Sequence, residues 1–555
     1  MSHSEPWVRI IPLGGLGEIG MNMTLLETEE DLLVIDAGLM FPEEEMLGID
    51  LVLPEVTYLL EQRQKVRGVV LTHGHEDHTG SLPYLLPALP VPVYGTPLAL
   101  GLVQEKLREF NLDQTADLRS IRPGDGLRLG GLNLEFIRVS HSIPDGVAIA
   151  VHTAAGLILH SGDFKFDQTP VDGELTDFRR FAGLGEQGVL LLLSDSTNST
   201  REGITASESA IYRTFESIFR TAPRRIIVAC FASHIHRIQQ ILDVAARLGK
   251  KVAVNGKSMT ANTRIAAELG YLRVPEGTLV RLDELTRFPP DQGVIITTGS
   301  QGEPLSAVAR MAVGEHKQIE ILPGDTVIFS ARVIPGNEKS IARTVNHLFR
   351  RGAEVITEDG CPGVHVSGHP SREELKLMLN LTRPRFFVPV HGEYRHLHYH
   401  AQLAKRVGIP EDHVFLLENG DVLEVRPTWG KVVSRVPAGR VFVDGKAIGD
   451  VGDTVLRDRQ HLAQDGMVVV VIGFDKSGVV VAGPDIVSRG FAHLAEDDEL
   501  FEEARRLIIT VLDGCSVEEK TDWTLIKQRI RSVLRKFLQK RVDRRPMILP
   551  VIIEV

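Results

Sequence analysis

The sequence predicts an α/β protein: an αββα sandwich that is interrupted by an inserted α/β domain and followed by a small α+β C-terminal domain. Three observations lead to this prediction. The first 205 residues carry many short β-branched strands and few helices, the next stretch to about residue 350 alternates strands with helices, and the tail from residue 461 has strands and helices of its own. At about 100–200 residues per domain, 555 residues suffice for about three domains.

The changes in the pattern of expected strands and helices give the domain boundaries. Residues 1–205 and 351–448 form the sandwich, residues 206–350 the inserted domain, 449–460 a linker and 461–555 the C-terminal domain. Short β-branched runs between turns predict sandwich strands at Trp7–Pro12, Asp31–Asp36, Gly68–Leu71, Val91–Gly95, Leu132–Val139, Val147–Thr153, Gly156–Ser161, Val189–Ser194, Glu354–Thr357 and Phe386–Val390, with helices at Val56–Gln64, Gly80–Leu86 and Ser371–Asn380. The inserted domain is expected to have strands at Arg225–Cys230, Lys251–Asn255, Gly293–Thr297 and Thr326–Ser330, with helices at Ser207–Thr221 and His234–Leu248. The final strand of the tail is expected at Met547–Ile553.

Composition limits the class of protein. Lysine and arginine number 62 against 73 acidic residues, and the net charge of −11 argues against a partner recognised by bulk charge, such as nucleic acid or an anionic membrane. This average does not exclude binding by local cations, such as bound metal ions or a single basic helix. The three cysteines are far apart and odd in number, which excludes a disulfide framework and favours a reducing cytosol. Apolar runs such as Met467–Phe474 are far shorter than the ~20 residues that span a bilayer. We therefore expect a cytoplasmic protein without a membrane partner.

A glycine motif near the N-terminus resembles a nucleotide-binding fingerprint. Gly15, Gly17 and Gly20 follow a strand in the pattern G-x-G-x-x-G. That fingerprint needs a following helix to hold the pyrophosphate, whereas Met21–Leu26 alternates apolar and polar residues and leads into another strand. We expect a glycine-rich turn near an active site instead.

The segment Leu71-Thr-His-Gly-His-Glu-Asp-His-Thr79 has the highest density of potential metal-ligating side chains. Imidazole and carboxylate groups suit divalent ions such as Zn²⁺ or Mn²⁺. His73 and His75 are two residues apart after an apolar strand, so they can share one ion, while Asp77 and His78 turn toward a second position. His141, Asp163 and His391 each follow another expected strand. Because such strand ends converge in layered α/β proteins, the sequence predicts a dinuclear metal site.

This arrangement of His73-x-His75-x-Asp77-His78 with Asp36, His141, Asp163 and His391 resembles the metallo-β-lactamase superfamily. The resemblance implies that His73, His75 and His141 hold one metal, that Asp77, His78 and His391 hold the other, and that Asp163 bridges them. It also implies that Asp36 orients a ligand. The metals could act on a phosphodiester, an amide or a thioester, so this motif alone does not name the substrate.

Three further segments resemble the motifs of the β-CASP nucleases: Leu193–Asn198 with Asp195, His365-Val-Ser-Gly-His369, and Val390–Glu393 with His391. The histidine at position 391 is typical of the RNA-processing members of that group. The resemblance extends to the ribonuclease J family through Pro12–Asn22, Phe41–Asp50, Phe231–Arg237 and Thr298–Pro304. It implies a 5′-to-3′ exonuclease, with possible endonuclease activity, that acts on single-stranded RNA with a 5′-monophosphate in RNA decay and in rRNA and mRNA maturation. A homodimer or tetramer and a place in an RNA-degradation complex are also implied.

The same resemblance assigns site residues. The catalytic residues would be Asp77, Asp195 and His369, with His369 protonating the leaving 3′-oxygen and Asp195 supporting it. The residues that bind the RNA phosphates would be Ser233, His234, Ile235, His365, Val366, Ser367, Gly368 and His369. Gly48, Asp50 and Asp444 would form a peripheral site for Ca²⁺ or Mg²⁺. Two alternatives stay open: a hydrolase of a small thioester or lactam, and a non-catalytic RNA-binding scaffold.

Two features of the chain lie outside these motifs. Between Trp523 and Arg545 nine basic residues and one acidic residue accompany apolar residues at helical spacing. This pattern predicts an amphipathic helix with a cationic face, which serves either as a solvated face, as an RNA contact or in subunit assembly. His396, His398 and His400 are expected to decorate a solvent-facing helix.

Overall fold

The computed structural model describes residues 5–303, 306–334, 336–445, 447–475, 478–491, 498–516, 519–520 and 522–555. The chain divides into two compact units. The first comprises Met1–Phe41 and Leu51–Val441, and the second comprises Pro42–Asp50 and Phe442–Val555. No helix in the described ranges is long and apolar enough to cross a membrane.

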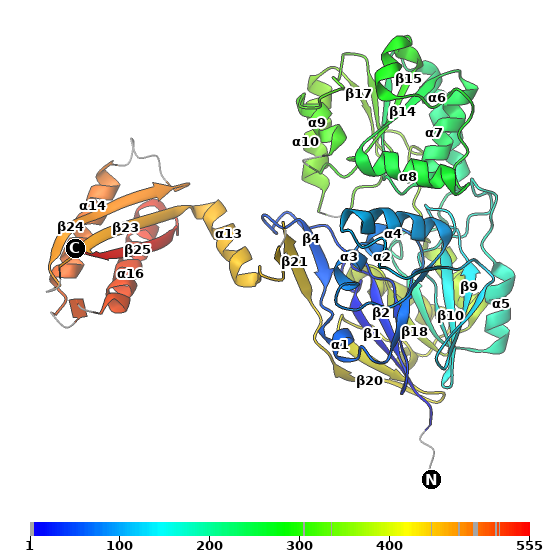
Figure 1. Ribbon diagram of the computed structural model, residues 1–555, viewed down its shortest axis with the longest axis horizontal. Helices are drawn as coiled ribbons and strands as arrows, with labels where there is room; N and C mark the ends of the chain where they lie inside the picture. The colour runs from blue at the N-terminus through cyan, green and yellow to red at the C-terminus, as the bar shows by residue number, and fades with distance from the viewer. Residues whose placement is uncertain are drawn as a thin grey trace. The chain divides into compact units, whose positions relative to one another are not determined.

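The first unit contains two sheets that face each other (Figure 1). The eight-stranded sheet has the order β20-β19-β1-β2-β3-β5-β6-β7, and the six-stranded sheet the order β18-β12-β11-β10-β9-β8. The strands of the first sheet are β1 (Val8–Gly14), β2 (Met23–Glu27), β3 (Leu32–Ile35), β5 (Val66–Val70), β6 (Val93–Gly95), β7 (Leu118–Ser120), β19 (Asp421–Val425) and β20 (Gly430–Arg435). Those of the second are β8 (Gly126–Leu129), β9 (Leu132–Arg138), β10 (Val147–Thr153), β11 (Gly156–His160), β12 (Val189–Asp195) and β18 (Phe386–Val390). Another strand, β4 (Leu51–Pro54), lies outside both sheets.

The inward faces of the two sheets make the central core. Val8, Ile10 and Ile35 of the first sheet pack into one buried cluster with Phe136 and Leu191 of the second. Helices α1 (Thr57–Glu61), α3 (Leu82–Leu85) and α4 (Pro97–Glu109) cover the outer face of the first sheet. Helices α5 (Phe178–Gln187), α11 (Arg372–Thr382) and α12 (Tyr394–Arg406) cover that of the second. These four layers form the αββα sandwich that the sequence predicts.

The inserted domain has its own sheet (green in Figure 1). Its five strands are all parallel, in the order β14-β15-β13-β16-β17. They are β13 (Ile226–Ala229), β14 (Lys251–Asn255), β15 (Gly293–Thr297), β16 (Thr326–Phe329) and β17 (Glu354–Ile356), with helices α6 (Ile211–Thr221), α7 (Ile235–Arg247), α8 (Lys257–Glu268), α9 (Ala307–Val313) and α10 (Glu338–Arg350). Short 3₁₀ turns are η1 (Glu208–Ala210), η2 (Leu282–Arg287), η3 (Pro290–Gln292) and, in the sandwich, η4 (Glu411–His413). The chain leaves the sandwich after β12 and returns through α11 to β18, which pairs with β12 in parallel. The strand expected in the sandwich at Glu354–Thr357 belongs instead to the inserted sheet, because β17 pairs with β16.

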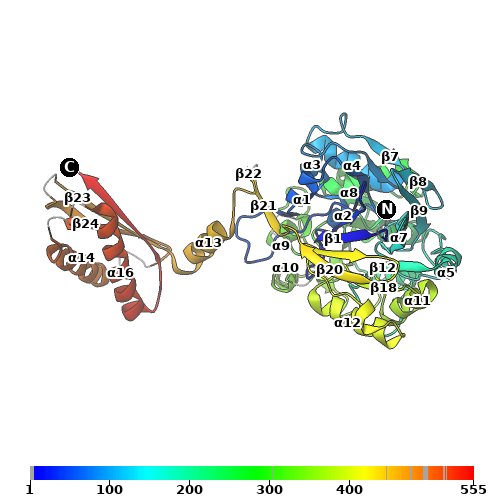
Figure 2. The same ribbon diagram turned by 90° about the horizontal axis from the view of Figure 1, so that it is seen from below.

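The second unit is built on the sheet β24-β23-β25 (Figure 2). Its main elements are α13 (Asp453–Asp465), β23 (Met467–Phe474), β24 (Val480–Arg489), α14 (Asp498–Asp513), α16 (Trp523–Val542) and β25 (Met547–Glu554), and β21 (Arg440–Asp444) pairs with β22 (Ala447–Ile448) near its start. Helices α14 and α16 bury their apolar residues against one face of this sheet. Residues 449–460, expected as a linker, include the start of α13.

Two local expectations have clear outcomes. The glycine motif lies in the turn between β1 and β2, which pair antiparallel, so no helix follows it as a dinucleotide site requires. The expectation that the histidines of α12 face solvent is wrong for two of them. His396 and His400 are 6% and 0% exposed, because α12 packs on β18 and the His400 ring contacts Phe387.

Candidate active site and metal centre

The candidate metal-ligating residues directly follow the C-terminal ends of strands. His73, His75 and the short helix α2 (Glu76–Thr79) follow β5, while His141, Asp163 and His391 follow β9, β11 and β18. The close approach of segments at this edge leaves little room. A Cβ on Gly38 would lie 1.7 Å from the carbonyl oxygen of Asp77, so only glycine fits there.

Three histidines form the first group of metal-ligating atoms. Nε2 of His73 lies 2.9 Å from Nδ1 of His75, and Nε2 of His141 lies 3.3 Å from the same Nδ1. Burial lowers the pKa of His75 to about 4. Burial together with neighbouring histidines also holds the pKa of His73 and of His141 well below the usual range. These imidazoles are therefore neutral at pH 7, the form that binds a metal.

Two carboxylates and two histidines form the second group. Oδ2 of Asp163 lies 3.3 Å from Nε2 of His78 and 3.4 Å from Nε2 of His391, and Oδ2 of Asp77 lies 3.3 Å from that same nitrogen of His391. Although burial raises the pKa of a carboxyl group, the histidine charges hold the pKa of Asp163 and of Asp77 below the usual range. Burial opposes the charge on His391, yet Asp163 and Asp77 raise its pKa to about 9.

Asp163 also connects the two groups. Its Oδ2 lies 3.8 Å from Nε2 of His73 and 3.8 Å from Nε2 of His141. Ligands about 2.1 Å from a tetrahedral ion stand roughly 3.4 Å apart, which agrees with the separations within both groups. All the ligand atoms of each group lie within 4.8 Å of one another. The donor set thus fits divalent metal ions, and Asp163 is placed to contact an ion on either side.

The outer nitrogens of the histidines are fixed by hydrogen bonds. Nδ1 of His78 lies 2.8 Å from Oδ2 of Asp36, which also accepts a hydrogen bond from the Thr72 hydroxyl. Nδ1 of His141 lies 2.7 Å from the carbonyl oxygen of Gly368, and only a glycine allows this approach because a Cβ there would lie 2.6 Å from the imidazole. Such partners select the tautomer that leaves the other ring nitrogen free for a metal.

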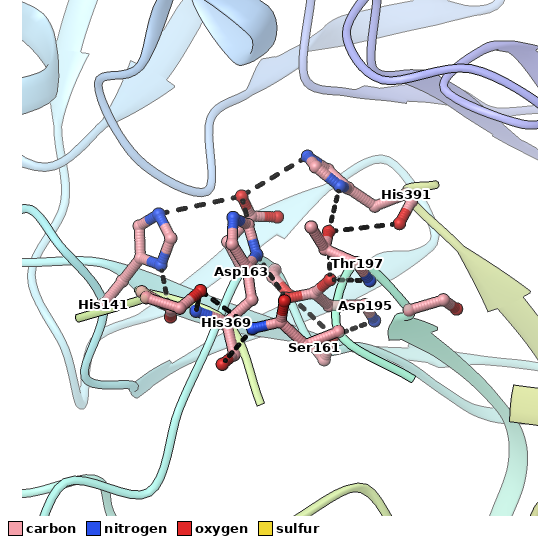
Figure 3. Close-up of polar contacts among 12 residues, drawn as sticks. His141, Ser161, Asp163, Asp195, Thr197, His369 and His391 are labelled. Atoms are coloured by element: carbon pink, nitrogen blue, oxygen red, sulfur yellow. Dashed lines mark hydrogen bonds and ion pairs between the residues drawn. The ribbon is translucent and has the colours of Figure 1, made fainter. Parts of the chain in front are cut away.

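Beside the metal groups lies a second constellation (Figure 3). Nδ1 of His369 lies 2.8 Å from Oδ2 of Asp195, whose Oδ1 accepts a hydrogen bond from the Thr197 hydroxyl. That hydroxyl lies 2.7 Å from Nδ1 of His391. The His369 side chain is 20% exposed, whereas Asp195 is fully buried. Asp195 therefore fixes an imidazole that borders both metal groups and still reaches solvent.

The segments expected to bind phosphate come together from the two domains. His234 directly precedes α7, and its ring centroid lies 6.3 Å from that of His365. Nδ1 of His365 is buried and has no hydrogen-bond partner among the described residues, whereas Nε2 of His234 lies 3.5 Å from Oε1 of Glu208. Burial lowers the pKa of His234 to about 4, and burial together with the charge of Arg237 holds that of His365 well below the usual range.

A buried arginine holds this pocket in place. Arg237 is fully buried, is paired with Glu208 at 3.0 Å, and donates a hydrogen bond of 3.0 Å to the carbonyl oxygen of Val364. The Ser330 hydroxyl donates to the same carbonyl at 2.7 Å. The loop that carries the remaining expected residues, His365, Val366, Ser367, Gly368 and His369, therefore starts from a fixed point. Ser233 is half-buried and Ile235 buried at the start of α7.

Four family models match consecutive parts of the chain. They describe the metallo-beta-lactamase superfamily (residues 16–198), the ribonuclease J beta-CASP domain (223–348), a Zn-dependent metallo-hydrolase RNA specificity domain (363–416) and the ribonuclease J C-terminal domain (454–555). Ribonuclease J2 of Bacillus subtilis is 43% identical over 99% of both chains. Ribonuclease J of Thermus thermophilus is 45% identical over 99% of this chain and 95% of its own. The chain belongs to the ribonuclease J family.

Membership of the ribonuclease J family confirms the predicted fold class: a metallo-β-lactamase domain with a β-CASP insertion and a C-terminal domain. A solved structure of a protein of unknown function from Enterococcus faecalis V583 shares the fold over 76% of this chain, with a TM-score of 0.54 at 14% identity. At this identity the likeness concerns the fold alone.

The expected peripheral cation residues have other partners in this member of the ribonuclease J family. Asp444 pairs with Arg459, and Asp50 accepts a hydrogen bond of 2.7 Å from the backbone N–H of Gly445. A Cβ on Gly48 would lie 2.7 Å from a guanidinium nitrogen of the same Arg459. These residues are not among the convergent ligand groups found in the described part of the chain, so the cation site stays a prediction.

Sequence reasoning missed several residues that support the site. Thr72 and Thr197 lie inside the motifs that were recognised, one or two residues from His73 and Asp195, but hydroxyl groups carry no ligand signal of their own. Asn198 donates hydrogen bonds to the Ser367 hydroxyl and the His369 carbonyl, at 2.8 and 3.0 Å. No spacing in the sequence indicates these contacts, because they join segments about 170 residues apart.

Proposed function

We propose that this metal-dependent ribonuclease degrades single-stranded RNA from a 5′-monophosphate end toward the 3′ end. The observation that carries the proposal is the position of His369, which is held by Asp195, borders both metal groups and belongs to the loop that starts at the His365 pocket. A site for a terminal phosphate beside the hydrolytic centre favours removal of one nucleotide at a time.

We propose His73, His75 and His141 as the ligands of one ion, Asp77, His78 and His391 as those of the other, and Asp163 as the bridge. Zn²⁺ and Mn²⁺ are the metals that this set of imidazoles and carboxylates suits best. When bound, two such ions lower the pKa of a water molecule and neutralise charge on the attacked phosphate.

The residues of the chain then have distinct tasks. Asp36, Thr197 and the Gly368 carbonyl fix the ring orientations of His78, His391 and His141. Because Nδ1 of His369 donates to Asp195, its Nε2 is free to hold a proton, and the buried carboxylate stabilises the protonated ring. His369 gives that proton to the 3′-oxygen as the bond to phosphorus breaks.

The 5′-phosphate pocket is assigned to His234 and His365 with Ser233, Ile235 and the loop up to His369. A buried nitrogen without a partner, such as Nδ1 of His365, is costly unless a ligand satisfies it. The fully buried Arg237, paired with Glu208, fixes the start of the loop behind this nitrogen, and a dianionic terminal phosphate supplies the missing partner.

One assay tests this proposal directly. The protein is incubated with Mn²⁺ and single-stranded RNA bearing a 5′-monophosphate, a 5′-triphosphate or a 5′-hydroxyl, and His75→Ala serves as the control. We expect mononucleotides to be released about tenfold or more faster from the monophosphorylated RNA, since each charged hydrogen bond contributes about 1.5 kcal/mol or more. His365→Ala is expected to reduce this preference and leave slow cleavage of the hydroxyl RNA.

The outcomes separate the alternatives. Cleavage that stays equal in His75→Ala would contradict the metal assignment. Binding of RNA without turnover under any metal would support the scaffold function, and hydrolysis of a thioester or lactam without RNA cleavage would support the small-molecule hydrolase. Fragments from internal cuts would indicate an endonuclease.

We also propose that the second unit mediates self-association. One face of its sheet is covered by α14 and α16, but the other carries exposed apolar residues. Val487 and Leu549, 41% and 43% exposed, flank Val469 in one register row across three strands. An apolar patch of this kind marks a protein interface more often than a free surface.

The double variant Val487→Glu/Leu549→Glu is therefore expected to be monomeric. Charges placed in an apolar interface oppose association because they must be desolvated. Light scattering gives the mass of the wild type, which we expect to be a dimer or tetramer, and of the variant. Gln528→Glu on the exposed side of α16 is the matched control, and an unchanged mass in the double variant would contradict this interface.

A further inference from the structure

An arginine that neither the sequence motifs nor the metal site accounts for lies next to the catalytic loop. Nη1 of Arg332, in the segment after β16, donates a hydrogen bond of 3.1 Å to Oδ1 of Asn198. Asn198 in turn holds the Ser367 hydroxyl and the His369 carbonyl. Arg332 is therefore connected to the loop of His369 through a single side chain.

A second arginine approaches the same asparagine. The backbone N–H of Arg201 donates to the carbonyl oxygen of Asn198 at 2.8 Å, so both residues belong to one turn. The Arg201 side chain is exposed and forms no ion pair within the described ranges. Burial lowers the pKa of Arg332, and the charge of Arg201 lowers it further. Arg332 thus contacts the turn that carries Arg201, and two cationic residues share this turn beside the loop of His369.

The balancing negative charge is small. Nη2 of Arg332 lies 3.3 Å from Oε1 of Glu358, which is 32% exposed, and the nearby Glu202 is paired with Arg372. The Nε of Arg332 is buried and has no hydrogen-bond partner among the described residues. A cluster with surplus positive charge and an unused donor is suited to an anion.

We propose that Arg201 and Arg332 form a subsite for an internal phosphate of the RNA backbone, next to the pocket of His234 and His365 that is assigned to the terminal phosphate. This inference rests on the proposed function of the same site. Without RNA, Glu358 competes for the guanidinium of Arg332. A backbone phosphate takes its place, pairs with Arg332 and Arg201, and aligns the strand beside His369.

Equilibrium binding tests the subsite without requiring turnover. The probe is a short phosphorothioate-linked oligoadenylate with a 3′-fluorescein, which resists hydrolysis, and its affinity for the metal-loaded protein is measured by anisotropy at several salt concentrations. We expect Arg332→Gln and Arg201→Gln each to weaken binding about fivefold to tenfold and to reduce the slope of log affinity against log salt by about 0.7. Arg281→Gln, at an exposed arginine paired with Asp283, is the matched control.

Two further variants distinguish a phosphate contact from a structural role. Glutamine at position 332 can still donate to Asn198, so a residue that only positions the loop would keep its salt slope in Arg332→Gln. Glu358→Gln is expected to tighten binding severalfold because it removes the competing carboxylate, and a loss of affinity in this variant would contradict the proposal.

The 5′ end of the probe identifies which phosphate is bound. We expect the loss in Arg332→Gln to be the same for probes with a 5′-monophosphate and a 5′-hydroxyl. A loss confined to the monophosphorylated probe would overturn the assignment to the backbone, as would unchanged affinity in both arginine variants or no binding by the wild type. If the wild type binds RNA with these effects but does not cleave it, the proposed function fails and the subsite stands.

Discussion

Asp163→Asn is expected to reduce RNA hydrolysis by about 10³-fold or more, which corresponds to about 4 kcal/mol of transition-state stabilisation. The Asp163 carboxylate lies within 3.9 Å of five imidazoles, so its negative charge lies between the two groups of candidate metal ligands. Asparagine keeps the shape but removes the charge and one acceptor. We therefore expect the variant to fold and to bind less metal.

Two measurements check this expectation together. Metal content per chain, determined by elemental analysis after gel filtration, should fall below that of the wild type, and single-turnover cleavage of monophosphorylated RNA should fall with it. Asp113→Asn, at a half-buried carboxylate of the same domain that is paired with Arg108, is the control. Full metal content and full activity in Asp163→Asn would contradict the bridging role.

His369→Ala is expected to lower kcat by about 10²–10⁴-fold while metal content stays at the wild-type level. The reason is that we assign His369 as a proton donor and not as a metal ligand. Asp195→Asn should lose a large part of the same factor, because it leaves the ring in place but no longer stabilises its protonated form.

The double variant His369→Ala/Asp195→Asn gives the sharper result. Residues that act as one unit are not additive, so the double variant should be about as slow as His369→Ala alone. Losses that multiply would indicate that Asp195 acts on its own, for example through Thr197 on His391. RNA with a better leaving group at the 3′-oxygen should recover much of the activity lost in His369→Ala.

Buried apolar strands were the most predictable part of the fold. The bounds of β10, β15 and β18 agree with the sequence prediction because these strands are continuous apolar runs that are almost fully buried. Strands β7 and β20 were not predicted. Both are largely exposed and stand at the edge of a sheet, where backbone hydrogen bonds rather than apolar side chains hold a strand.

The candidate site also has a part that the sequence predicts and a part that it does not. The proposed metal ligands could be named from the sequence because histidine and aspartate cluster there directly after apolar strands. The contacts of Asn198 with Arg332 and Ser367 could not, since they join distant segments through ordinary polar groups. Long-range proximity of this kind is set by the tertiary fold and leaves no periodic trace.

The insertion has a consequence for how the protein folds. Strands β12 and β18 pair in register from Leu191 with Phe386 to Asp195 with Val390, although the inserted domain separates them in the chain. Contacts between such distant residues form slowly, whereas the inserted domain has a core of its own and can fold as a unit. Docking of β18 onto β12 also delivers His391 to the other ligands. We therefore expect the protein to bind metal late in folding. Metal content would then measure the fraction of molecules in which both halves of the sandwich have joined.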